Sequence, residues 1–288
     1  MKSSPLAIQN QLQKSLASVY LVTGDEPLQH METCDLIRHA AKQRGYTDRE
    51  IFHIDKNFDW SELFMSTSTM SLFSHLRFIE LRIGNGKLGE KGNKALFALL
   101  SELPQDTIIL ITSSKLDAAV QRTKWFKCLD KSGVSIQIWP IEARQLAAWI
   151  QQRMQKIGLL ASRDAIQILA ERGEGNLLAI AQEIEKLRLL GVAGDISVDD
   201  VLSSVSDSAR FDIYTFVDTC LGGDIRRVVR MLEGLQSEGV EAILVLWVMS
   251  REIRNMALMA KQTSNGLPLD QILSKNRVWP KRKALVGA

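Results

Sequence analysis

Residues 19–31 read VYLVTGDEPLQHM, an apolar run followed by a turn and the start of a helix. The first part of this stretch is rich in β-branched and aromatic residues, which favour a strand. Gly24 suits the turn, and Pro27 suits the first turn of a helix, where a missing N–H loses no partner. Apolar side chains then recur at every third residue from Leu28 to Ile37, as on one face of a helix. The stretch therefore predicts the strand, turn and helix that open a βα unit.

The same alternation continues as far as Trp139. Strands are predicted at 51–54, 76–83, 107–112 and 134–139, and helices at 60–65 and 119–130. The run 107–112 is almost entirely apolar, which is typical of a central strand that is buried on both faces. The predicted fold class of this region is an α/β domain built around a parallel sheet.

The β pattern ends at Pro140, and helical segments separated by glycines fill the rest of the chain. Helices are predicted near 146–157, 164–171, 176–190, 198–205, 211–221, 224–237, 241–261 and 269–275. A polar stretch near 203–210 divides them, so we expect three domains: an α/β domain at 1–140, a small helical domain at 141–208 and a second helical domain at 209–288. Residues 279–285 resemble the first turn of another helix, so we expect the last domain to be incomplete at its C-terminus.

The composition is that of an ordinary globular protein. Of the 288 residues, 45% are hydrophobic and 24% are charged, which excludes a disordered or collagen-like chain. The net charge of +3 is too small for a polybasic DNA binder. Three scattered cysteines indicate neither a disulfide framework nor a zinc knuckle. Without an export signal or a long apolar run, we expect a cytoplasmic protein that does not enter a membrane.

The turn after the first strand is where a nucleotide-binding protein places its phosphate loop. A Walker A motif that starts at Gly24 requires Gly, Lys and Ser or Thr at positions 29, 30 and 31. The chain has Gln29, His30 and Met31 at these positions. It therefore lacks the cation for the phosphates and the hydroxyl for Mg²⁺, and we expect a degenerate nucleotide site that binds no ATP.

Two acidic residues in the same turn also argue against ATP binding. Asp25 and Glu26 place carboxylates at the helix start, where they compete with phosphate for the backbone amides. We expect both acids to cap the helix instead.

Residues 84–89 read GNGKLG and match the pattern G-x-G-x-x-G of dinucleotide-binding proteins. However, the next predicted strand has Asp106 at its start, whereas a ribose-binding acid belongs at the carboxyl end. We interpret residues 84–92 as a surface loop, with a nicotinamide enzyme as the alternative. The four histidines form no metal motif and no nucleophile elbow occurs. We therefore expect no catalytic residue, no metal and no cofactor.

The segment STSTMSLFSH at 66–75 places three large apolar residues inside a polar loop just before a strand. One interpretation is a helix end whose apolar residues fill the core. The other is a protruding motif in which Leu72 and Phe73 anchor in a pocket of another protein, where each fully buried side chain contributes roughly 1.5 to 3 kcal/mol. The residues alone leave both interpretations open.

Four segments together resemble the delta subunits of bacterial DNA polymerase III clamp loaders, which have the fold of the AAA+ superfamily. These segments are 20–28, 70–73, 174–180 and 277–279. The resemblance extends over essentially the whole chain. It implies a RecA-like AAA+ domain at 1–140, a helical lid domain at 141–208 and a helical collar domain at 209–288.

The resemblance also implies a function. A delta subunit binds the beta sliding clamp and opens it for loading onto primed DNA, without hydrolysing ATP itself. Its partners are the gamma/tau and delta-prime subunits in a hetero-pentamer, which belongs to a DNA-directed DNA polymerase holoenzyme, a nucleotidyltransferase complex. The alternative is a catalytically active AAA+ ATPase, which the absent Walker A lysine argues against.

Individual residues take roles from the same resemblance. Met70, Ser71, Leu72 and Phe73 match the clamp-binding motif, in which the last two are the hydrophobic anchors. Thr69 stands where the general motif has Gln, so one amide contact is lost. Asn176 begins the lid helix that presents a sensor arginine in active ATPases, and no arginine occurs in its first two turns. The resemblance therefore predicts a subunit that acts mechanically.

Overall fold

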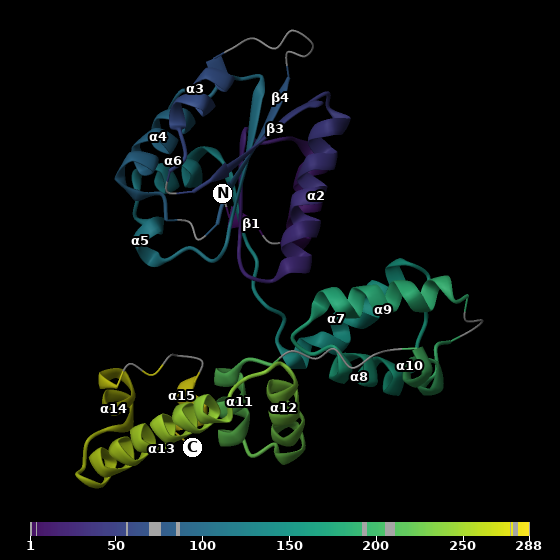
Figure 1. The fold of residues 1–288 in the computed structure, drawn as a ribbon, viewed down its shortest axis with the longest axis vertical. Coiled ribbons are helices and arrows are strands. Elements are labelled where there is room, and N and C mark those ends of the chain that lie inside the picture. The colour runs from purple at the N-terminus through teal and green to yellow at the C-terminus, as the bar shows by residue number, and fades with distance from the viewer. Residues whose placement is uncertain are drawn as a thin grey trace. The chain divides into compact units, whose positions relative to one another are not determined.

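The computed structural model describes residues 2–3, 5–55, 57–68, 76–84, 87–191, 195–204, 211–276, 278 and 282–287. The chain forms two compact units, residues 1–140 and 141–288. The first unit contains a parallel sheet with helices and the second is helical (Figure 1). The predicted fold class, a parallel α/β domain followed by helices, is confirmed. The division of the second unit near residue 208 stays a prediction.

The first unit follows the order that the βα pattern predicts. Its elements are β1 (Lys2–Ser3), α1 (Pro5–Lys14), β2 (Val19–Thr23), α2 (Pro27–Gln43), β3 (Asp48–Ile54), α3 (Trp60–Ser68), β4 (Arg77–Ile83), α4 (Gly89–Ser101), β5 (Thr107–Ser113), α5 (Ala118–Gln121), α6 (Lys124–Ser132) and β6 (Val134–Gln137).

The strands form one sheet in the order β1-β6-β2-β5-β4-β3, and every pair is parallel. Strand β5 lies between β2 and β4 and is buried along nearly its whole length, as its apolar sequence predicts. Ser113 at the end of β5 is in register with Thr23 of β2 and with Ile83 of β4. The carboxyl ends of these three strands therefore meet at one edge of the sheet.

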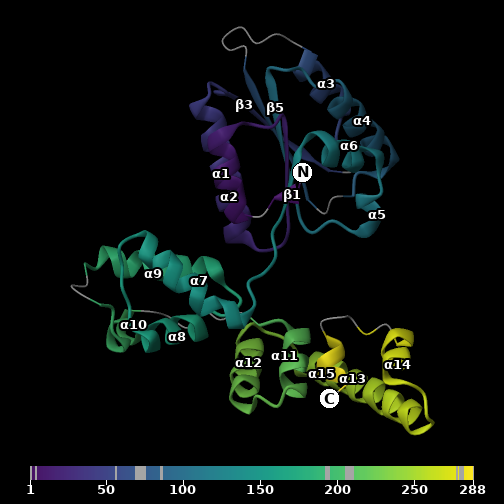
Figure 2. The ribbon, with the colours of Figure 1, turned by 180° about the vertical axis from the view of Figure 1, so that it is seen from behind.

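Helices cover both faces of this sheet. Helices α1 and α2 lie on one face, and α3, α4 and α6 lie on the other (Figures 1 and 2). The first face packs Ile8, Ile37 and similar side chains against β2 and β5. The second packs Leu63, Leu96 and Trp125 against the opposite sides of the same strands. Two apolar layers thus hold the strand ends in place.

Several element boundaries differ from the predictions. Strand β3 begins at Asp48, three positions early, and the predicted helix 119–130 is two helices, because Thr123 has an extended backbone between α5 and α6. Strand β1 and helices α1 and α4 were not predicted. Helix α4 begins at Gly89, so the loop predicted through 92 is shorter. Gly92 is a packing residue, since a Cβ there would lie 3.0 Å from the ring of Trp60.

The second unit consists of helices within its described residues. They are α7 (Ala143–Lys156), α8 (Arg163–Arg172), α9 (Leu177–Leu189), α10 (Val198–Ser204), α11 (Ile213–Leu221), α12 (Ile225–Ser237), α13 (Ala242–Ser264), α14 (Leu269–Lys275) and α15 (Lys283–Val286). Ser162 caps α8 by accepting a hydrogen bond from the Ala165 amide at 3.2 Å. Of the helices in the described ranges, none is both long and apolar enough to cross a membrane.

Candidate functional site

A groove lies at the edge of the sheet where β2, β4 and β5 end. In open parallel sheets, ligands bind outside the carboxyl ends of the strands, so this groove corresponds to a nucleotide site in position. Of the predicted site residues, it contains Gly24, Asp25, His30 and Met31. The other residues that line it are Pro27, Arg82, Ile83, Gly84, Thr112, Ser113 and Ser114.

Gly24 makes the sharp turn between β2 and α2. Its φ of +134° lies in a region that side-chain-bearing residues rarely adopt, and a Cβ at this position would lie 2.2 Å from the carbonyl oxygen of Ile138. The glycine therefore has a structural reason to be present that is independent of any phosphate.

A Gly24→Ala variant tests this reading. We expect the free energy of unfolding to fall by about 2 kcal/mol or more. The reason is that alanine would be strained at this φ and its Cβ would clash with the backbone of Ile138. Gly84→Ala in the same groove is the matched control, since a Cβ there would meet nothing within 4 Å. Urea denaturation of both variants measures the difference, and equal midpoints would contradict the explanation.

Glu26 occupies the start of α2 as its N-cap. Its carboxylate accepts hydrogen bonds from the amides of Gln29 at 2.6 Å and of Leu28 at 3.3 Å. Burial raises the pKa of Glu26, and these amide contacts oppose that rise. Free amides at a helix start are the groups that would bind phosphate, and here two of them already bind a carboxylate.

Asp25 does not cap the helix, so that part of the prediction is wrong. Its Oδ1 accepts a hydrogen bond from the amide of Lys115 at 3.0 Å. The Lys115 ammonium group lies 5.3 Å from the ring centroid of Trp139. Asp25 thus ties the turn after β2 to the loop after β5, and its carboxylate stays at the groove.

His30 stands at the sequence position of a Walker lysine. Burial lowers the pKa of His30, although the backbone near Val22 and Ser113 favours the charged form. Its Nδ1 lies 3.9 Å from the Sγ of Cys34, one turn along α2. Burial raises the pKa of the Cys34 thiol to about 12, so this cysteine is not a reactive thiolate at neutral pH.

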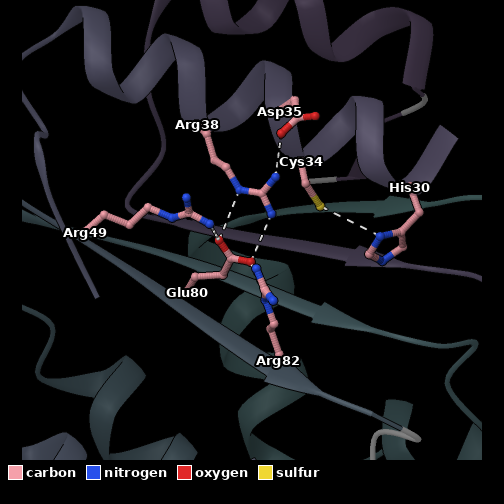
Figure 3. A network of polar contacts seen from close by, with 7 residues as sticks. All are labelled: His30, Cys34, Asp35, Arg38, Arg49, Glu80 and Arg82. Atoms are coloured by element: carbon pink, nitrogen blue, oxygen red, sulfur yellow. Dashed lines mark hydrogen bonds and ion pairs between the residues drawn. The ribbon is translucent and has the colours of Figure 1, made fainter. Parts of the chain in front are cut away.

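A network of arginines surrounds one carboxylate beside the groove (Figure 3). Glu80 on β4 is 0% exposed and accepts hydrogen bonds from Arg38 at 2.9 and 3.1 Å, from Arg49 at 2.6 Å and from Arg82 at 2.8 Å. Arg38 also bonds Asp35 at 2.6 Å. Arg82, whose guanidinium group bonds Glu80, is also one of the residues that line the groove.

Asn176 lies in the second unit, where it is the N-cap of α9. Its Oδ1 accepts a hydrogen bond from the Ala179 amide at 3.1 Å. The residue therefore has a capping role of its own.

The predicted clamp-binding residues Met70, Ser71, Leu72 and Phe73 lie outside the described residues. Their flanks are described: α3 ends at Ser68 and β4 begins at Arg77. The role of these four residues stays a prediction.

Arg82 and the hydroxyl residues 112–114 at the groove were not predicted as site residues. A signal was available, because they lie at the ends of two strands that were predicted. Only the strand order brings those ends beside Gly24. Among the described residues, no group of three or more His, Cys, Asp or Glu side chains could hold a metal ion.

Comparison with known proteins identifies two matching families. The family described as "DNA polymerase III, delta subunit" matches residues 20–138. The family described as "Processivity clamp loader gamma complex DNA pol III C-term" matches residues 213–288. The two matches fall in different units of the structure.

Individual relatives give the same result. The chain is 31% identical to DNA polymerase III subunit delta of Escherichia coli, over 98% of this chain and 82% of that protein. It is 28% identical to the same subunit of Haemophilus influenzae, over 98% and 85% of the two chains. A solved DNA clamp loader delta protein of Bacillus subtilis aligns over 98% of this chain and 86% of its own, with a TM-score of 0.54 and 20% identity. The last likeness shows that the two chains share a fold.

The likeness to the Escherichia coli protein spans both units and most of both chains. The chain belongs to the family of DNA polymerase III delta subunits, which are components of the clamp loader.

Proposed function

We propose that this chain binds the beta sliding clamp through Met70, Ser71, Leu72 and Phe73, and opens it for loading onto primed DNA. It does so as a non-hydrolysing subunit of a hetero-pentamer with gamma/tau and delta-prime subunits. Membership of the delta family supports the clamp as partner. The sequence MSLF at 70–73, just before β4, supports this segment as the contact.

The observation that carries the ATP-free part of the proposal is the contact of Glu26. Its carboxylate binds the amides of Leu28 and Gln29, which a phosphate would need. Asp25 adds a second negative charge at the groove. A triphosphate entering here would find two amides of the helix start already occupied and the Asp25 carboxylate beside them, although Arg82 also lines the groove. The alternative of an active ATPase finds no support in these contacts.

Ring opening follows from binding preference. A ligand shifts a conformational equilibrium only by the difference between its affinities for the two states. If this chain binds the opened form of the clamp more tightly than the closed form, binding alone favours opening. The energy for release then comes from nucleotide hydrolysis in partner subunits.

Exposed apolar side chains in the second unit support assembly with other subunits. Ile225 on α12 is 76% exposed and Ile243 on α13 is 70% exposed, and Leu246 and Trp247 on α13 are exposed as well. Ile243, Leu246 and Trp247 are three and four residues apart and therefore share one face of α13, and exposed apolar surface of this kind is typical of protein interfaces. We propose that residues 209–288 are the collar domain that packs against partner subunits.

The proposal predicts clamp binding that does not depend on nucleotide. In a calorimetric titration, we expect the isolated chain to bind the sliding clamp with the same dissociation constant with and without ATP and Mg²⁺. The clamp titrated with ATP and Mg²⁺ alone is the control. A change in affinity of more than about tenfold on adding nucleotide, equivalent to about 1.4 kcal/mol, would contradict the proposal, as would ATP turnover by the isolated chain.

A further inference from the structure

Arg77 lies where the chain enters β4, directly after the segment 69–75 that carries the proposed clamp contact. On the other side of this segment is the last turn of α3, which contains Ser66. The guanidinium group of Arg77 donates hydrogen bonds to the carbonyl oxygen of Ser66 and to the carboxylate of Glu50 on β3. Its Nη2 also lies 2.9 Å from Ser66 Oγ. One side chain therefore joins the two flanks of the segment.

The contacts around Arg77 close into a triangle. The hydroxyl of Ser66 donates to Glu50 Oε2 at 2.6 Å, so each of the three residues bonds the other two. Asp48 adds a carboxylate oxygen 3.9 Å from Arg77 Nε. The backbone amide of Arg77 donates to the carbonyl oxygen of Asp106 at 2.9 Å. The flank at β4 is thus fixed in the sheet, and the flank at α3 is fixed to it.

Stability alone does not explain an arginine at this position. Arg77 is only 8% exposed, and the residues that follow it, Phe78, Ile79 and Leu81, are buried and apolar. Replacing a buried ion pair by well-packed apolar side chains is often neutral or stabilising. Apolar residues at both 77 and 50 would serve the strands equally well, but they would not fix the direction of a bond to the last turn of α3.

We propose that Arg77, with Ser66 and Glu50, is a positioning residue for the clamp contact, a role that rests on the function proposed above. By tying the last turn of α3 to the start of β4, the triangle holds fixed the two described ends between which the proposed clamp contact lies. Binding residues on a fixed base cost less ordering free energy than the same residues on a loose one. Clamp affinity therefore depends on Arg77, although Arg77 itself need not touch the clamp.

Arg77→Met tests this role, because methionine keeps length and apolar bulk but cannot form the triangle. We expect its affinity for the sliding clamp to fall about tenfold relative to the unmodified chain. Arg77→Lys, which can keep one of the bonds, should recover part of the loss. Arg44→Met is the matched control, since Arg44 also donates to backbone carbonyls, those of Leu12 and Gln13. We expect this control to bind with unchanged affinity.

Titration calorimetry is carried out below the unfolding temperature of each variant, as established by circular dichroism. A folded Arg77→Met variant that binds as tightly as the unmodified chain overturns the positioning role while leaving the clamp contact intact. An unmodified chain that does not bind the clamp overturns the proposed function and this inference together. If Arg77→Met does not fold, Ser66→Ala takes its place, with an expected loss of about threefold, and unchanged affinity of that variant overturns the role equally.

Discussion

Replacing Leu72 and Phe73 together by alanine is expected to abolish measurable clamp binding by the isolated chain. Each anchor that becomes fully buried in a pocket contributes roughly 1.5 to 3 kcal/mol. Losing both removes about 3 to 6 kcal/mol, which corresponds to a weakening of roughly 100-fold or more. Titration calorimetry with the sliding clamp measures this loss directly.

The same double variant separates the two interpretations of the segment 66–75. If Leu72 and Phe73 are anchors for a partner, the free energy of unfolding stays within about 1 kcal/mol of the original value. If they fill the core of their own domain, truncating both lowers that free energy by several kcal/mol, because cavities form. Leu189→Ala, an exposed leucine of α9, is the control and should change neither property. Retained clamp affinity would refute the anchor role.

The second large effect is expected at Glu80. Changing Glu80 to Gln leaves Arg38, Arg49 and Arg82 around a neutral amide, and removing one partner of a buried ion pair is strongly destabilising. The side chains of Arg49 and Arg82 are 39% and 41% exposed and can turn towards water. We therefore expect the free energy of unfolding to fall by about 3 kcal/mol, near the lower end of the usual range for such a change. Glu185→Gln, which breaks an exposed pair with Arg188, should cause no measurable change. Equal unfolding midpoints for the two variants would contradict this account.

The effect at Glu80 also has a predicted pH dependence. Burial alone would raise the pKa of Glu80, but hydrogen bonds from the three arginines outweigh it and lower the pKa to about 2. A carboxylate with a depressed pKa in the folded state stabilises the protein fully above its unfolded value near 4.5. That stabilisation is lost as the pH falls from about 4.5 towards 2. The difference between the original protein and Glu80→Gln should therefore shrink across this window, and a constant difference would refute the assignment.

The parts of the fold that sequence could predict are those with a local signal. The strand at Val19–Thr23 and the helix after Pro27 follow from a β-rich run, a glycine turn and apolar spacing, and both are confirmed. Residues 89–92 were assigned to a loop because Gly92 resembles a loop residue in sequence, whereas they form the start of α4. Its real function is to admit the ring of Trp60, a contact that no local pattern reveals.

The candidate site divides in the same way. Glu26 could be predicted as a cap because its partners are two and three residues away. The network of Glu80 could not, because Arg38 and Arg49 lie 42 and 31 residues from it along the chain. Only the pairing of β3 with β4 and the packing of α2 bring them together. Contacts between distant segments depend on strand order, which single-sequence patterns do not determine.

The cap at Glu26 has one more consequence. A phosphate group arrives and departs with metabolism, whereas a side chain is permanently tethered at the position it fills. The turn between β2 and α2 is therefore expected to keep the same conformation whatever the concentration of ATP in the cell. A subunit built this way can keep this part of its structure unchanged while neighbouring subunits change conformation.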